Sequence, residues 1–180
     1  MMLEGLPSDL VPPDAPWPIV LGFDPGTLKA GYGAVVSAPD GPRLLACGAL
    51  SAPASMSVPK RLARISEGFE VLLDRLRPQM VAVESAFAAR NVRSALRIGE
   101  ARGIALAGAA RRGIQVHEIA PASAKKAVVG HGAASKEQVA AMVGTILGAR
   151  IEAALDATDA LALALACLQK NEFARRLSAD

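Results

Sequence analysis

The feature that most constrains this chain is an apolar run near its start that ends in a single carboxylate. Residues 19–23 (IVLGF) lead directly into Asp24, and Pro25 and Gly26 follow as a turn signal. Such a run predicts a strand buried on both faces, with Asp24 at the rim of the sheet. A second apolar run, at 31–36 (GYGAVV), predicts a strand that returns beside the first. The alternative is that Asp24 only caps its own turn.

The same pattern returns at Met80–Glu84, where a short apolar run again ends in a carboxylate. A helix is predicted before it, from Ser57 to Arg77, because Pro59 suits a first helical turn and apolar residues repeat at helical spacing. A strand entered from a helix is expected to lie parallel to an earlier strand. Glu84 is therefore expected at the same edge of the sheet as Asp24.

The last predicted helix, from about Leu155 to Lys170, brings two more acids. Asp156 and Asp159 are three residues apart and share one face of the first turn. Acids there also stabilise the helix dipole, so an N-terminal capping pair is the alternative. Nine uncharged, nearly all apolar residues follow Asp159, which predicts that the helix packs on the sheet and holds its acidic end at the rim.

Four carboxylates, those of Asp24, Glu84, Asp156 and Asp159, are thus expected to meet at one spot. Clustered carboxylates repel one another unless hard cations lie among them, and an all-oxygen ligand set suits Mg²⁺ or Mn²⁺. Two such ions can clamp the attacking water and the leaving oxygen of a phosphodiester. The acids therefore predict metal-assisted phosphodiester chemistry.

Basic residues are concentrated in one segment. Residues 85–136 hold nine Lys and Arg against two Glu, although the net charge of the chain is only +3. This concentration favours a polyanionic partner, which beside the acids indicates nucleic acid. Arg90, Arg93 and Arg97 follow one another at helical spacing and are expected to track phosphates. A solvated helix face is the alternative.

The remaining segments complete one α/β domain, a size that 180 residues suit. We expect a flexible tail at 1–17, the domain at 18–170 and a C-terminal tail at 171–180. Further elements are predicted as a strand at 43–51, a strand at 114–119, and helices at 91–112, 121–129 and 135–147.

The cysteines and the apolar runs favour a cytoplasmic protein. Cys47 and Cys167 lie in apolar segments without Cys or His at metal spacing, as expected of reduced, buried thiols. No apolar run approaches the ~20 residues of a membrane helix. A basic segment followed by an apolar one, the mark of a secretory signal, is absent from the N-terminus.

Five segments carry a resemblance when they are taken together in chain order. They are GFDPGT at 22–27 with GYG at 31–33, VE at 83–84 with Phe87 and Asn91, SAL at 94–96 with GEARG at 99–103, VVG at 128–130, and DATDALA at 156–162. Together they resemble the RuvC family, the bacterial crossover junction endodeoxyribonucleases of the RNase H-like superfamily. The resemblance spans residues 19–167.

This resemblance implies an RNase H-like fold, in which helices flank a mixed five-stranded sheet of three antiparallel and then parallel strands. It also implies a homodimer that resolves four-way (Holliday) DNA junctions in homologous recombination and repair, by symmetric cuts in two strands of like polarity. Each subunit would use two Mg²⁺ ions, or Mn²⁺ in their place, and leave 5′-phosphates. The RuvA–RuvB branch-migration complex is a candidate partner.

The resemblance also assigns roles to residues. The four acids fall on the family's acidic positions: Asp24 would bridge the two ions, Glu84 and Asp159 would each hold one side, and Asp156 would complete the shell. Three further residues fall on DNA-contacting positions of the family: Phe87, which would stack on junction bases, and the basic Lys125 and Lys136. Since aromatics make up only 3% of this chain, a buried core role for Phe87 is the alternative.

Two features depart from the family pattern. Some members carry a metal-site His two residues after the last acid, where this chain has Leu161, and His131 is too distant in sequence to be assumed a substitute. The acidic, proline-rich stretch at 1–17 also has no assigned role.

The helix at 91–112 is the expected dimer contact. Interior glycines at Gly99, Gly103 and Gly108 each cost ~1 kcal/mol relative to Ala, and close approach of a second helix would offset that cost. Packing against the subunit's own sheet is the alternative.

Three other functions stay open from the sequence. Asp24-Pro25-Gly26-Thr27 also resembles the first phosphate loop of actin-like ATPases, although a second Asp-x-Gly-Thr is missing. An RNA-processing nuclease of the same superfamily is another possibility. The third is a DNA-binding dimer without catalysis, which a complete acidic set disfavours.

Overall fold

The chain folds into one α/β unit in the computed structural model, which describes residues 17–85, 92–149, 151 and 155–177. Most of the expected N-terminal tail therefore lies outside the described residues, as do Phe87 and Arg90. The elements, in chain order, are β1 (Ile19–Asp24), β2 (Lys29–Ala38), β3 (Gly41–Ser51), α1 (Val58–Leu76), β4 (Met80–Glu84), α2 (Val92–Arg111), β5 (Gln115–Ile119), α3 (Pro121–Val129), α4 (Lys136–Leu147) and α5 (Leu155–Leu177).

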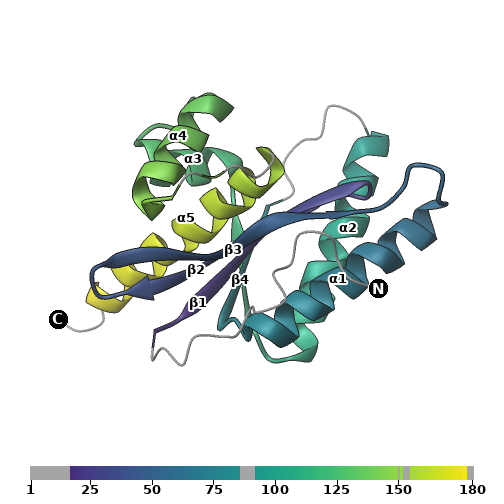
Figure 1. The fold of residues 1–180 in the computed structure, drawn as a ribbon, viewed down its shortest axis with the longest axis horizontal. Helices are drawn as coiled ribbons and strands as arrows, with labels where there is room; N and C mark the ends of the chain where they lie inside the picture. Colours follow the sequence, from purple (N-terminus) through teal and green to yellow (C-terminus); the bar gives the residue numbers. More distant parts are fainter. Residues whose placement is uncertain (1–16, 86–91, 150, 152–154, 178–180) are drawn as a thin grey trace.

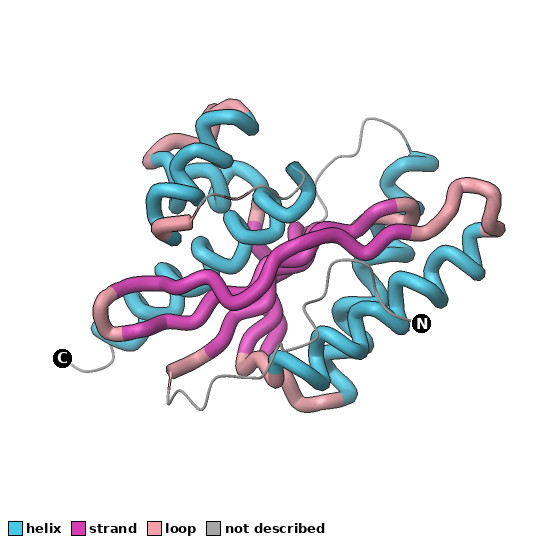
Figure 2. The backbone as a smooth tube through the Cα atoms, in the orientation of Figure 1, coloured by secondary structure: helices cyan, strands magenta, loops and turns pink. Residues whose placement is uncertain are grey.

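The strands form a single mixed sheet in the order β3-β2-β1-β4-β5. β1 pairs antiparallel with β2, and β2 antiparallel with β3, whereas β1 with β4 and β4 with β5 are parallel pairs. Figure 2 shows β2 and β3 as a long twisted hairpin that extends beyond the other strands. The predicted sheet, three antiparallel strands followed by parallel ones, is confirmed.

Helices cover both faces of the sheet. Successive residues of β1 point to opposite faces, so Leu21 lies in a core with Phe69 of α1, whereas Val20 shares a core with Leu161 of α5. Figure 1 shows α1 and α2 on one side of the sheet and α3, α4 and α5 on the other. Two thin apolar cores built largely of Ala, Val, Leu and Ile therefore hold the sheet in the middle.

Glycines let α5 lie against the centre of the sheet. A Cβ added at Gly22 would lie 1.9 Å from the carbonyl oxygen of Ala160, and one at Gly31 would lie 2.0 Å from that of Asp156. Since these are distances that no side chain tolerates, only glycine permits this approach. The prediction that the last helix packs on the sheet is confirmed.

The end of α5 differs from the prediction. The helix continues to Leu177, seven residues beyond the expected end at Lys170, so part of the expected tail at 171–180 is helical. The apolar pattern does stop near Leu168, but a helix needs no buried face to continue as a polar extension. Its polar turn is held at the sheet where the Ser37 hydroxyl donates to a Glu172 carboxylate oxygen at 3.0 Å.

Among the helices of the described ranges, none combines the length and the apolar character that crossing a bilayer requires.

Candidate nuclease active site

Two of the four acids stand at the ends of neighbouring parallel strands. Asp24 ends β1 and Glu84 ends β4, and the residues just before them, Phe23 and Val83, are partners in the parallel ladder. Parallel pairing brings the carboxyl ends of both strands to one edge of the sheet. The predicted placement of Asp24 and Glu84 at a common edge is confirmed.

The other two acids come from the first turns of α5. Asp24 faces Gly31 across the antiparallel ladder, and the backbone of Asp156 lies directly over Gly31. The start of α5 is therefore fixed above the end of β1. One turn further, Asp159 lines a hollow together with Glu84. The sheet and the helix thus bring all four carboxylates to one rim.

The electrostatics of Asp24 show how crowded this rim is. Burial, reinforced by the negative charges of Glu84, Asp159 and Asp156, raises the pKa of Asp24 from 3.8 to about 7, although Lys136 opposes the shift. Burial, with the charge of Asp159, also raises the pKa of Glu84. The ionised site is therefore under repulsion that an added cation would relieve.

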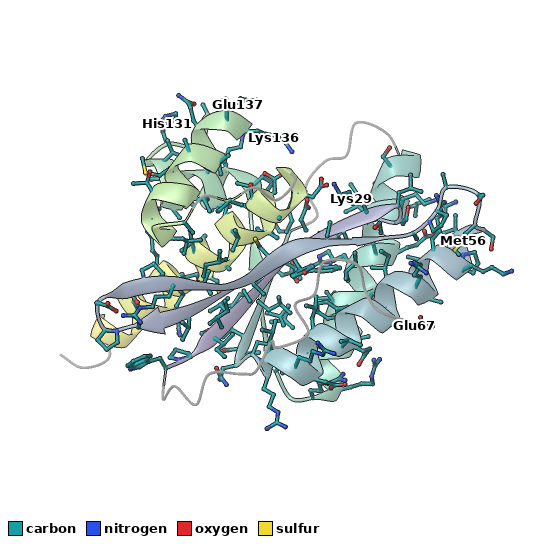
Figure 3. The ribbon with its side chains drawn as sticks, in the orientation of Figure 1. Lys29, Met56, Glu67, His131, Lys136 and Glu137 are labelled. Carbon is teal, nitrogen blue, oxygen red and sulfur yellow. The ribbon has the colours of Figure 1, made fainter. Side chains whose placement is uncertain are left out.

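Two lysines already supply positive charge at this rim. The Lys29 ammonium lies 2.6 Å from Oδ2 of Asp156, and the Lys136 ammonium lies 2.6 Å from Oδ2 of Asp159. The hydrogen bond to Asp159 raises the pKa of Lys136. Figure 3 shows Lys29 and Lys136 reaching toward the start of α5 from opposite sides. Each lysine thus places one positive charge beside one carboxylate of the site.

The donor atoms of the four acids suit a hard divalent cation. All four side chains offer carboxylate oxygens, the ligands that Mg²⁺ and Mn²⁺ prefer. Within the described ranges, no three His, Cys, Asp or Glu side chains already stand in a metal-holding arrangement, and two of the four carboxylates bond to lysines instead. A metal ion bound at Asp156 or at Asp159 would therefore compete with an ammonium group for that carboxylate.

A hollow beside α5 holds two of the predicted DNA-contacting lysines. Lys125 of α3 and Lys136 of α4 line it opposite Glu84. The Lys125 ammonium donates to the carbonyl oxygen of Ala134 at 2.7 Å, so it braces the loop between α3 and α4, while Lys136 bonds to Asp159 as described above. Both are brought to the acids, but each has a protein partner.

A second, open groove lies on the other flank of the acids. It runs between the turn after β1 and the start of α2 and is lined by Gly26, Thr27, Leu28, Lys29, Ser94, Arg97 and Ile98. The Arg97 guanidinium forms an ion pair with Glu100 at 2.8 Å. Of the other predicted arginines, Arg93 lies in α2 with its side chain outside the described part, and Arg90 falls outside altogether. The groove therefore gives Arg97 a position from which it can contact a bound strand.

Sequence reasoning missed Lys29 as a residue of this site. The available signal was its place five residues after Asp24, at the first position of the strand that pairs with β1. Neither residue considered in connection with the family's metal-site His adds a ligand: Leu161 is buried in the core, and His131 is exposed in the loop between α3 and α4. Both placements agree with the interpretation from sequence.

The exposed face of α2 matches part of the predicted dimer contact. Val92 and Leu96 are 77% and 63% exposed, and a Cβ added at Gly99 or Gly103 would meet no atom of the described residues within 4 Å. Gly108 is different, because its missing side chain faces the Phe69 ring of α1 in the same subunit. The early turns of α2 are thus open, whereas packing within the subunit explains the last glycine.

Comparison with known proteins agrees with the resemblance found in the sequence. Residues 20–167 match the family model described as "Crossover junction endodeoxyribonuclease RuvC". A protein of that name from Chloroflexus aurantiacus is 46% identical over 146 residues, which cover 81% of this chain and 89% of the relative. Another, from Dehalococcoides mccartyi, is 44% identical over 156 residues, covering 86% and 94%.

Solved structures show the same fold. T. thermophilus RuvC in complex with a Holliday junction substrate superposes with a TM-score of 0.81 at 35% identity, over 87% of this chain and 96% of that one. The yeast mitochondrial resolvase Ydc2 shares the fold, with a TM-score of 0.59 at 17% identity, over 88% of this chain and 79% of that one.

Proposed function

Because the chain belongs to the RuvC family of crossover junction endodeoxyribonucleases, we propose that it resolves four-way DNA junctions by cutting two strands of like polarity. The observation that carries the proposal is the meeting of Asp24, Glu84, Asp156 and Asp159 at one sheet edge, where burial, reinforced by the other carboxylates, raises the pKa of Asp24 to about 7. Perturbed carboxylate pKa values gather at catalytic sites, which supports catalysis over DNA binding alone. The activity belongs to homologous recombination and DNA repair.

The four acids would hold the metal ions, Mg²⁺ or Mn²⁺. Bound there, divalent ions would activate water for in-line attack on phosphorus and stabilise the charge on the leaving oxygen, giving 5′-phosphate ends. Asp24 interacts electrostatically with the other three acids, which supports a central role for it in holding the ions. Glu84 and Asp159 share the hollow beside α5, and Asp156 faces the opposite groove through Lys29.

The chain's own cations would orient the DNA. The hollow on one flank presents Lys125 and Lys136, and the groove on the other flank presents Lys29 and Arg97. Contacts of such groups with phosphates fix a strand in register without reading its sequence. Arg90, Arg93 and the stacking residue Phe87 are proposed to add further contacts with the DNA.

A homodimer would provide the second active site. Symmetric cleavage of two strands requires two sites related by a two-fold axis, which a C₂ interface supplies. The open face of α2, with Val92, Leu96, Gly99 and Gly103, supports the proposal that this helix forms the contact.

Two further assignments follow from the family. The RuvA–RuvB complex is proposed as a partner on the same junction. A cytoplasmic location is proposed because the substrate is DNA and because Cys47 and Cys167 are free thiols.

The test is a comparison of substrates with one preparation of the protein. A synthetic four-way junction should be nicked in paired strands when Mg²⁺ or Mn²⁺ is present, whereas linear duplex and RNA should stay intact and ATP should not be hydrolysed. Equal cleavage of RNA would favour the RNA-processing nuclease, and ATP hydrolysis would favour the actin-like ATPase. Binding of the junction without cleavage under any divalent ion would leave only the DNA-binding dimer.

A further inference from the structure

Lys29 lies between the acidic site and the open groove beside α2. Its ammonium bonds to Oδ2 of Asp156 at 2.6 Å, while its side chain also lines the open groove between the turn after β1 and α2. In Figure 3 Lys29 reaches from the start of β2 toward the first turn of α5. One side chain thus borders both the acidic site and the groove.

The ion pair with Asp156 is of a kind that exchanges readily. The Lys29 and Asp156 side chains are 44% and 36% exposed, and ion pairs in contact with water contribute little net stability. Lysine also carries a compact charge on a flexible four-carbon stem. The ammonium can therefore leave Asp156 at small cost and move into the groove without any movement of the backbone.

A divalent ion at the acids would make this exchange favourable. It would place a second positive charge on the carboxylate that Lys29 holds, and like charges a few ångströms apart repel. Among the described residues that line the groove there is no Asp or Glu, so a phosphate of bound DNA would be the anion that Lys29 meets there.

We propose that Lys29 is an exchangeable positioning residue, which neutralises Asp156 in the free protein and moves to a DNA phosphate when a divalent ion takes that carboxylate. This inference rests on the proposed function, because it needs both a metal ion and DNA at the site. Its consequence is reciprocal: metal binding releases a cation for DNA, and DNA binding frees a ligand for metal. No residue need act on the reacting phosphorus for this coupling to exist.

The first measurement is metal binding without DNA. Calorimetric titration with Mn²⁺ should show that Lys29→Met binds the ion roughly two- to fivefold more tightly than the natural protein, because the competing ammonium is gone. Lys29→Arg keeps the charge and should not gain affinity. Lys60→Met is the matched control, since Lys60 is an exposed lysine of α1 outside the site. Equal Mn²⁺ affinity in the natural protein and in Lys29→Met would overturn the proposal.

The second measurement is the salt dependence of junction binding. It is made once with EDTA and once with Ca²⁺, and a denaturing gel checks that the junction stays intact. With EDTA, Lys29 remains mainly on Asp156, so the slopes of log Kd against log salt for the natural protein and for Lys29→Met should differ much less than they do with Ca²⁺. With Ca²⁺, the slope for the natural protein should be steeper than the slope for Lys29→Met by about 0.9, the value for one added phosphate contact. A slope difference that is the same in both conditions would show an ordinary phosphate-binding lysine and overturn the exchange.

Failure of this inference can be told apart from failure of the proposed function. If the natural protein binds neither Mn²⁺ nor the junction, the function itself is wrong, and the exchange falls with it. If it binds both, and Lys29→Met matches Lys60→Met in both measurements, only the exchange is wrong.

Discussion

Gly31 lies directly beneath Asp156: a Cβ added at Gly31 would stand 2.0 Å from the carbonyl oxygen of Asp156 and 3.2 Å from its Cβ. Gly31 is also the ladder partner of Asp24. A residue without a side chain therefore sets the spacing between the end of β1 and the start of α5. That spacing decides whether the acids of the sheet and those of the helix can bind the same metal ion.

The first prediction is that Gly31→Ala lowers cleavage far more than junction binding. The added methyl must push α5 away from the sheet, which costs about 1–3 kcal/mol of stability, and a displacement of about 1 Å at a reacting centre can cost ~100-fold in rate. Single-turnover cleavage and thermal melting measure the two effects. Gly99→Ala, where the added Cβ meets nothing within 4 Å, is the control for stability and should melt no lower than the natural protein. Normal cleavage by Gly31→Ala would show that this spacing is not critical.

The second prediction concerns Asp24→Asn. The substitution removes a charged ligand but keeps the shape, so cleavage with Mg²⁺ or Mn²⁺ should fall by more than ~100-fold, the loss that even an outer-shell partner of a metal site can cause. Junction affinity should survive, because the basic contacts are unchanged. Gel-shift and cleavage assays on the same junction measure both properties. Cleavage at the natural rate would remove Asp24 from the catalytic site.

The third prediction is the pH dependence of stability in EDTA. Burial raises the pKa of Asp24 from its ordinary value of 3.8 to about 7 in the folded protein, so the folded state holds the proton more tightly. Ionisation of Asp24 therefore destabilises the folded protein. The free energy of unfolding falls as the pH rises from about 4 to about 7. Asp24→Asn cannot ionise and should be more stable than the natural protein at pH 8.5, by on the order of 4 kcal/mol at most.

The control for this prediction is the same comparison at lower pH. At pH 5 the advantage of Asp24→Asn should be much smaller, because most of the natural Asp24 is then protonated. Melting temperatures at the two pH values in EDTA are sufficient. An equal gain in melting temperature at both pH values would mean that the ionisation of Asp24 does not cause the difference in stability.

The fourth prediction concerns Phe87, which lies outside the described residues. If it stacks on a junction base, Phe87→Ala should remove a contact worth ~1–3 kcal/mol and lower junction cleavage much more than the melting temperature. Cleavage by the folded variant and its thermal unfolding are compared with those of the natural protein. A large fall in melting temperature with normal cleavage would assign Phe87 to the core instead.

The fifth prediction tests the α2 contact. Gly99→Leu and Gly103→Leu place a bulky side chain on the open face of the helix, where each subunit's own structure has room for it. The variants should fold as monomers that at best nick a junction. Light scattering at micromolar concentration gives the oligomeric state. A monomeric natural protein, or dimers that both substitutions leave intact, would exclude this helix as the interface.

Local patterns were sufficient to predict most of the elements and the candidate acids. Apolar runs that end in Asp24 and Glu84 marked both strands and the edge they share, because strand periodicity and the direction of parallel connections are local rules. The helix predicted at 135–147 is present as α4, and Ser135 and Gln138 form a reciprocal pair of hydrogen bonds at its start. The end of α5 was not predicted, since its polar extension is held by a distant contact between Ser37 and Glu172.

The sequence by itself determined the order of the elements, the positions of the four acids and the family. Only the tertiary structure decided how those acids are neutralised: Lys29 bonds to Asp156 across 127 positions of chain and Lys136 to Asp159 across 23. It also decided that Gly99 and Gly103 face open space while Gly108 packs on Phe69. The physical reason is the range of the interactions. Strand and helix signals depend on neighbours in sequence, whereas charge pairing and burial depend on which distant segments the packed sheet brings together.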